Sequence, residues 1–249
     1  ASLHHRHRAA HHELAEQRLP ARIGHALQRL GVALHAHQER LAIALDRLTA
    51  LAGLKSAEEL RATLTAYPEI AAFIGEAGTD PRESFVTLIR RALTAPQALS
   101  AASRRLAARL EQTPPPRPEA EALFLTLRPI YGDADVGLLA LFYLNLIHLE
   151  AGEGLYLPAG VPHAYVHGNL VECMANSDNV VRVGLTHKFK DAEALLEILA
   201  PALGPLPVLR PEPEVPEVSY PTPAAEFEVR RLALERGAHR AMGPRSSVE

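Results

Sequence analysis

The segment "GEGLYLPAGVPHAYVHGNLVECMANSDNVVRVGLTHKFKD", residues 152–191, decides the fold expected for this chain. It contains short apolar runs such as "LYL", "LVECMA" and "VVRVGL", and these runs are separated by glycine, proline and the polar run "NSDN". Short apolar runs between such turn-forming residues are typical of β-strands joined by tight turns. The segment therefore predicts a small barrel of strands in a chain that otherwise looks helical.

Upstream of this segment, residues 38–112 have a different pattern. Leucine, isoleucine and alanine recur there at spacings of three and four residues, which predicts helices. Ser56 and Glu59 have the spacing of a capping box at a helix start. The breaker "TPPPRP", residues 113–118, ends the helical part. The expected fold class is α+β, a β-barrel with an α-helical subdomain.

The remaining parts of the chain alternate between helix, strand and irregular patterns. A further helix is predicted directly after the breaker, and another at residues 191–203. The proline-rich stretch at residues 205–223 is expected to be a connector without regular structure. Residues 226–234, "EFEVRRLAL", alternate like an edge strand.

The composition of the 249-residue chain restricts the class of protein. The net charge is −3, which gives no electrostatic basis for binding nucleic acid or an anionic membrane. The single cysteine, Cys173, excludes an intrachain disulfide and suits a reducing compartment. No apolar run reaches the roughly 18–20 residues of a membrane helix, and the first residues lack the apolar region of a signal peptide. We expect a cytoplasmic protein that is a monomer.

Residues 1–37 contain eight of the 13 histidines. Clustered histidines can bind metal. The cluster here shows no pair at a spacing of four residues that is backed by a carboxylate. The alternative is a solvated, basic and partly helical leader.

Two further residues of the decisive segment are candidates for chemistry. His163 follows the rigid turn "LPAGVP", so its ring is held in one direction, and neutral imidazole is the commonest metal ligand. The alternative is a histidine that is only hydrogen-bonded at the barrel mouth. Arg182 is predicted to point into the barrel, where a guanidinium needs an anion such as a phosphate, a carboxylate or a developing oxyanion. The alternative is a structural pair with Asp178 or Asp191.

Lys188 is a third candidate, because its ammonium group can supply a point charge to a phosphate. The alternative is an exposed, solvated lysine.

The segment 152–191 closely resembles the signature of the type I mannose-6-phosphate isomerases, which are zinc-dependent cupin enzymes. The match runs through "LPAGVPHAY", "VECMANSDN" and "VRVGLTHKF". Upstream, "LAIALDRLTALAGLKSAEEL" resembles the family in register and without gaps, and "YPTPAAEFEVRRLAL" resembles the start of the second cupin half. The resemblance covers residues 41–234.

This resemblance implies a fold, a reaction, a cofactor and three site residues. The fold is α+β, a cupin-like β-barrel of the jelly-roll type with an α-helical subdomain. The reaction is the interconversion of mannose 6-phosphate and fructose 6-phosphate through a cis-enediol, with zinc polarising the substrate carbonyl. By position, His163 matches a metal ligand, Arg182 the catalytic arginine, and Lys188 a lysine that binds the substrate's phosphate. The implied partner is a sugar phosphate.

The chain departs from the family pattern at its N-terminal end. Gapless alignment places Arg40 where the family has a zinc-binding glutamate, and the motif "QxHPDK" with two further ligands is missing. We expect weakly held zinc and isomerase activity far below that of an intact relative. The alternative is a non-catalytic sugar-phosphate-binding cupin remnant or an inactive fragment.

The predicted helices and strands, together with the resemblance, set the expected domain boundaries. Residues 1–40 are expected to be a degraded or disordered remnant, and residues 41–117 the helical subdomain. Residues 118–204 are expected to form the cupin domain. Residues 205–249 would hold the connector and the start of a truncated second cupin half.

Overall fold

The computed structural model describes residues 32–35, 39–75, 80–175, 180–200, 204–212, 216–237 and 239. Most of the histidine-rich stretch, for which metal binding and a solvated leader are the alternatives, lies outside these residues. No helix among the described residues is both long and apolar enough to cross a membrane.

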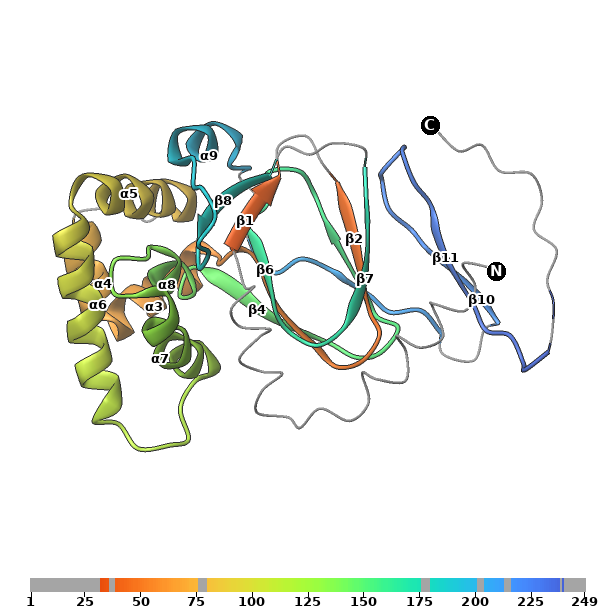
Figure 1. Cartoon of the computed structure of the whole chain (residues 1–249), viewed down its shortest axis with the longest axis horizontal. Helices are drawn as coiled ribbons and strands as arrows, with labels where there is room; N and C mark the ends of the chain where they lie inside the picture. The colour runs from red at the N-terminus through yellow and green to blue at the C-terminus, as the bar shows by residue number, and fades with distance from the viewer. Residues whose placement is uncertain are drawn as a thin grey trace, which may run out of the picture.

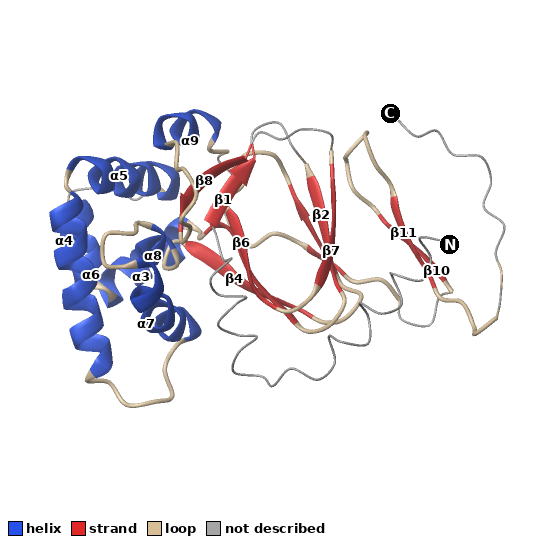
Figure 2. Cartoon of the chain, in the orientation of Figure 1, coloured by secondary structure: helices blue, strands red, loops and turns tan. Residues whose placement is uncertain are grey.

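Two antiparallel sheets face each other and form the walls of a barrel (Figures 1 and 2). Within the described residues, the first sheet has the order β4-β3-β6-β1-β8 and the second the order β7-β2-β5-β9. The strands of the first sheet are β4 (Leu144–Leu149), β3 (Leu48–Leu54), β6 (His163–His167), β1 (Val32–His35) and β8 (Val180–Gly184). The strands of the second are β7 (Leu170–Met174), β2 (Arg40–Ala44), β5 (Gly154–Leu157) and β9 (Val208–Leu209). The strands expected between residues 152 and 191 are confirmed.

The helix predicted over residues 40–54 is wrong, because these residues form the strands β2 and β3. Every residue of β2 is buried, and in β3 all but Thr49 are buried. A strand that is buried on both faces loses the alternation of apolar and polar residues by which a strand is recognised. Its many leucines and alanines then fall by chance at helical spacings.

A helical subdomain packs against the outer face of the first sheet (Figure 1). Its helices are α3 (Ala57–Ala66), α4 (Pro68–Ile74), α5 (Pro81–Thr94), α6 (Pro96–Glu111) and α7 (Glu119–Tyr131). The subdomain therefore begins at Ala57 rather than at residue 41. The predicted capping box is confirmed, since Ser56 Oγ accepts from Glu59 N and the Glu59 carboxylate accepts from Ser56 N.

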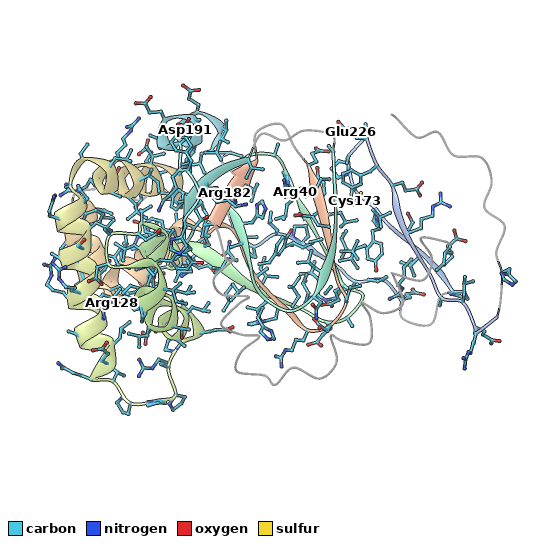
Figure 3. The ribbon with its side chains drawn as sticks, in the orientation of Figure 1. Arg40, Arg128, Cys173, Arg182, Asp191 and Glu226 are labelled. Carbon is cyan, nitrogen blue, oxygen red and sulfur yellow. The ribbon has the colours of Figure 1, made fainter. Side chains whose placement is uncertain are left out.

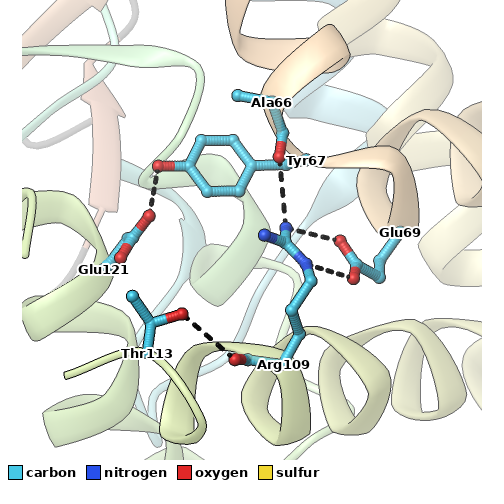
Figure 4. Close-up of polar contacts among 6 residues, drawn as sticks. All are labelled: Ala66, Tyr67, Glu69, Arg109, Thr113 and Glu121. Carbon is cyan, nitrogen blue, oxygen red and sulfur yellow. Dashed lines mark hydrogen bonds and ion pairs between the residues drawn. The ribbon is translucent and has the colours of Figure 1, made fainter.

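A polar cluster joins three of these helices (Figure 4). Arg109 of α6 donates to both carboxylate oxygens of Glu69 on α4, at 2.6 and 2.9 Å. Its guanidinium also lies 5.7 Å from the ring centre of Tyr67, whose hydroxyl donates to the buried Glu121 of α7 at 2.9 Å. Because these polar groups are hydrogen-bonded to one another, the cluster stabilises the helix contacts.

The prediction that the proline-rich stretch, residues 205–223, has no regular structure is wrong. The stretch contains β9 and also β10 (Glu217–Tyr220), which pairs with β11 (Val229–Leu232). The prolines stand before and after these short strands, where no ladder hydrogen bond is required of them. The strand predicted within residues 226–234 is confirmed by β11, and the helix predicted after residue 191 by α9 (Ala192–Ile198).

The hairpin of β10 and β11 lies at the end of the molecule opposite the helices (Figure 1). Tyr220 packs there with Leu41 and Ile43 on the outer face of the second sheet. Its hydroxyl donates to the carbonyl of Gly152 at 2.7 Å. Each sheet therefore has an outer cover, and the space between the sheets is the interior in which a site can form.

Candidate functional site

His163 and Arg182 lie on the same face of the first sheet. Ala33 of β1 is paired with His163 of β6 on one side and with Arg182 of β8 on the other. Residues directly opposite each other in antiparallel strands project to the same face. Two strand spacings separate His163 from Arg182, which places their Cα atoms about 10 Å apart. The structure thus brings together two of the three residues predicted from the sequence.

The imidazole of His163 is buried and held in one orientation. Its Nδ1 lies 2.9 Å from the carbonyl oxygen of Val161. A carbonyl only accepts hydrogen bonds, so Nδ1 carries the hydrogen and Nε2 is the acceptor nitrogen. Burial lowers the pKa of His163, and the positive charge of Arg40 lowers it further. The ring is therefore neutral, which is the form that can accept a proton or ligate a metal.

Arg40 enters the interior from the opposite sheet (Figure 3). Its side chain is buried, and Nη1 lies 3.1 Å from Oε1 of Glu172 on β7. The hydroxyl of Tyr165, on β6, donates to the same oxygen at 2.8 Å. The Tyr165 ring lies 5.9 Å from that of His163. We call Arg40, His163, Tyr165 and Glu172 the interior cluster; it links the two walls of the barrel.

Burial raises the pKa of Tyr165, and the negative charge of Glu172 raises it further. The phenol therefore keeps its proton and acts as a hydrogen-bond donor to Glu172 at neutral pH. Oε1 of Glu172 accepts one bond from a cation and one from a neutral donor, so this oxygen is committed within the cluster.

Glu172 and Tyr165 were not among the residues predicted to form the site. The strand "RLAIA" places Arg40 on the same face as Ala42 and Ala44, which points an arginine into the barrel. A buried guanidinium needs an anion. The acidic residue at the centre of "LVECM" is Glu172. If "RLAIA" had been recognised as a strand, Glu172 could have been predicted as the partner of Arg40.

Arg182 is half-buried on β8 and has no hydrogen bond or ion pair with the described residues. One alternative partner, Asp191, caps helix α9 by accepting from Ala194 N at 3.0 Å (Figure 3). The other, Asp178, lies outside the described residues. The guanidinium of Arg182 is thus not neutralised by Asp191.

The loop that carries Lys188 is anchored by the buried Asp135. One oxygen of Asp135 accepts from the backbone N–H of Gly137 at 2.8 Å and of Leu185 at 2.9 Å, and the other accepts from Lys190 Nζ at 2.8 Å. These bonds fix the end of β8. Lys188 itself is exposed, and its side chain does not join the interior cluster.

The interior cluster does not fit a zinc ion. Zinc in proteins is usually held by three or four nitrogen, sulfur or oxygen ligands. Among the described residues, no group of three or more histidine, cysteine, aspartate and glutamate side chains could hold a metal. Arg40 also contributes a positive charge beside Glu172, and two like unit charges about 4 Å apart repel by about 4 kcal/mol at an effective dielectric constant near 20.

Two facing antiparallel sheets with a polar cluster between them define a protein of the cupin class, with a helical subdomain added. No family model matches the chain. The solved structures that resemble it include the apo form of mannose 6-phosphate isomerase from Salmonella typhimurium. That match has 28% identity and a TM-score of 0.65, and covers 78% of this chain and 50% of the other. A structure described as mannose 6-phosphate isomerase bound with zinc and yttrium matches equally well.

Curated relatives agree with the structural match. Mannose-6-phosphate isomerase 2 of Arabidopsis thaliana is 36% identical over 220 residues, covering 81% of this chain and 49% of the relative. Mannose-6-phosphate isomerase of Bos taurus is 32% identical over 221 residues, covering 80% of this chain and 52% of the relative. Over the part that these relatives match, the chain is similar to the mannose-6-phosphate isomerases, as its signature segment predicted. The chain spans about half the length of the curated relatives it matches.

Proposed function

We propose that the chain acts as a mannose-6-phosphate isomerase, interconverting mannose 6-phosphate and fructose 6-phosphate. The observation that carries this proposal is the 36% identity to a relative of that name over 81% of the chain. The proposed substrate is a sugar phosphate, an anion that suits the positive charges of Arg182 and Lys188.

The proposed roles follow from position and charge. Arg182 is the catalytic residue: its guanidinium would stabilise the negative oxygen that develops as a proton moves between C1 and C2 of the sugar. The support is its half-buried position across Ala33 from His163 and the absence of a neutralising bond from Asp191. Lys188 would bind the phosphate, because it lies exposed on a loop whose backbone Asp135 fixes.

The zinc that the resemblance implies would have His163 as its ligand from this chain. The interior cluster does not supply the other ligands. Loss of a Lewis acid removes a large part of the stabilisation of an enediolate. We therefore expect turnover far below that of a relative that has the full ligand set.

A second candidate function is non-catalytic binding of a sugar phosphate. The ion pair of Arg40 with Glu172 favours it, because that pair stands where a metal-dependent isomerase needs acidic ligands. Arg182 and Lys188 would still attract the phosphate in such a protein.

One set of measurements separates the candidates. The full chain is assayed for conversion of mannose 6-phosphate to fructose 6-phosphate with a coupling enzyme, and binding of mannose 6-phosphate is measured by calorimetry. We expect slow turnover that Arg182→Ala abolishes and that Arg61→Ala, an exposed arginine of α3, preserves. Binding without turnover would support the second candidate. Neither binding nor turnover would show that both are wrong.

A further inference from the structure

The guanidinium of Arg40 is a buried positive charge at the centre of the barrel interior. Arg40 is 6% exposed, and its ion pair with Glu172 joins residues 132 positions apart in the chain. We propose that Arg40 is the resident cation of the interior cluster: it supplies the positive charge beside His163 and Glu172, so that the cluster is complete without a divalent metal and rejects one. This inference concerns metal binding and does not depend on the isomerase reaction.

The strand register explains how Arg40 reaches this position. Ala42 of β2 is paired with Glu172 of β7, so Glu172 is a diagonal neighbour of Arg40 on the same face. The small side chain of Ala42 leaves room for the guanidinium to approach the carboxylate. Tyr165, from the opposite sheet, completes the bonds to Glu172 at 2.8 Å. The carboxylate is therefore held by both walls of the barrel.

The charges of the cluster determine which ions it can accept. The charges of Arg40 and Glu172 cancel at a separation of 3.1 Å, and the hydroxyl of Tyr165 donates to the same carboxylate oxygen. A divalent cation beside Glu172 would leave two uncompensated positive charges in a buried site. It would also have to displace Arg40 from a carboxylate that the guanidinium already neutralises. Metal binding that depends on His163 should therefore be weak in the natural chain.

Replacing the positive charge at position 40 by a negative charge should allow the cluster to bind a divalent cation. The variant R40E removes the resident cation and adds a carboxylate close to His163 and Glu172. A neutral imidazole and two carboxylates are a ligand set that zinc accepts in proteins. We expect the variant to bind zinc through His163, although the natural chain does not.

Four full-length proteins test the proposal: the natural chain, H163A, R40E and the double variant R40E/H163A. Zinc binding is measured by titration calorimetry with zinc chloride, and folding by circular dichroism. The histidine-rich N-terminal residues are the same in all four, so only binding that depends on His163 changes within each pair. We expect H163A to leave zinc binding of the natural chain unchanged. We expect R40E to bind zinc at least about 10-fold more tightly than the natural chain does. The double variant R40E/H163A should lose this gain in affinity.

Two results would overturn the proposal. The first is a zinc site in the natural chain that H163A removes. The second is a folded R40E protein that gains no zinc binding dependent on His163. If R40E does not fold, R40Q removes the positive charge without placing a second carboxylate beside Glu172. R40Q should then show a smaller gain that H163A removes, and no gain would count against the proposal.

Discussion

Arg40 and Glu172 depend on each other because both are largely withdrawn from water. Their side chains are 7% and 21% exposed, and the charged atoms lie 3.1 Å apart. Removing one member of such a pair leaves the other charge buried without compensation, which costs more than the pair itself contributes. The interaction therefore restricts substitution at both positions, whatever its net effect on stability.

We predict that Glu172→Gln lowers the free energy of unfolding by about 3 kcal/mol, because the charge of Arg40 is then uncompensated. Replacing both residues, in R40M/E172M, should cost much less than Glu172→Gln alone, since no buried charge remains. Urea denaturation measures both effects.

A matched control is the exposed pair of Arg47 and Glu150, whose side chains are 75% and 72% exposed at 3.9 Å. Glu150→Gln should change stability by less than about 0.5 kcal/mol. Equal losses in Glu172→Gln and Glu150→Gln would show that the interior pair is not effectively buried.

At the scale of elements, the sequence predicts the strands that are bounded by turn residues better than those that are not. Glycine and proline mark the ends of β5 and β6, so their strand character is visible locally. Apart from Arg40 and Thr49, the strands β2 and β3 are apolar on both faces, and they are mistaken for helix. Proline-rich composition likewise hides β9 and β10, because it excludes long strands but not strands of two to four residues.

The candidate site, like the strands, is only partly predictable from the sequence. His163 is identifiable because a rigid turn precedes it, and Arg182 because its strand follows a turn. The bond between Arg40 and Glu172 joins residues 132 positions apart, and local sequence patterns contain no information about such pairing. Only the register of β2 against β7 brings the two side chains together.

The stability of the contact between α4 and α6 should depend on pH, because the Arg109–Glu69 ion pair joins the two helices. Hydrogen bonds from Arg109 lower the pKa of Glu69 below its usual value of 4.5. A lowered folded-state pKa means that the stabilisation is present above the unfolded-state pKa and is lost as pH falls through the folded-state pKa. We predict that Glu69→Gln costs about 1–2 kcal/mol at neutral pH, and that this difference from the natural chain shrinks below pH 4.5.

Thermal unfolding of both proteins between neutral pH and about pH 3 measures this difference. Glu58→Gln, at an exposed position on α3, is the control and should show little cost at either end of the range. A cost of Glu69→Gln that stays constant with pH would contradict the role of the charge.

At the scale of the whole molecule, the barrel is covered on both sides by different structures. The helical subdomain packs on the first sheet, and the hairpin of β10 and β11 packs on the second (Figure 1). The helical contact involves many side chains, whereas the hairpin contact centres on Tyr220 with Leu41 and Ile43. The hairpin is therefore the cover that a single substitution can release.

We predict that Tyr220→Ala destabilises the chain by about 3–5 kcal/mol and exposes the outer face of the second sheet. The ring is 2% exposed, and its loss leaves Leu41 and Ile43 without their cover. Tyr220→Phe keeps the ring and loses only the hydroxyl bond to the carbonyl of Gly152, so it should cost about 1 kcal/mol. Ser219→Ala, at an exposed position of the same strand, should cost less still.

Urea denaturation gives the three stabilities, and light scattering with binding of a hydrophobic dye detects the uncovered sheet. An apolar sheet face without a cover promotes association between molecules, so aggregation should increase in Tyr220→Ala alone. Equal stability and equal dye binding in Tyr220→Ala and Tyr220→Phe would show that the aromatic ring does not hold the hairpin. In that case the contacts of Phe227 and Val229, which pack against the same face, would have to carry the interaction.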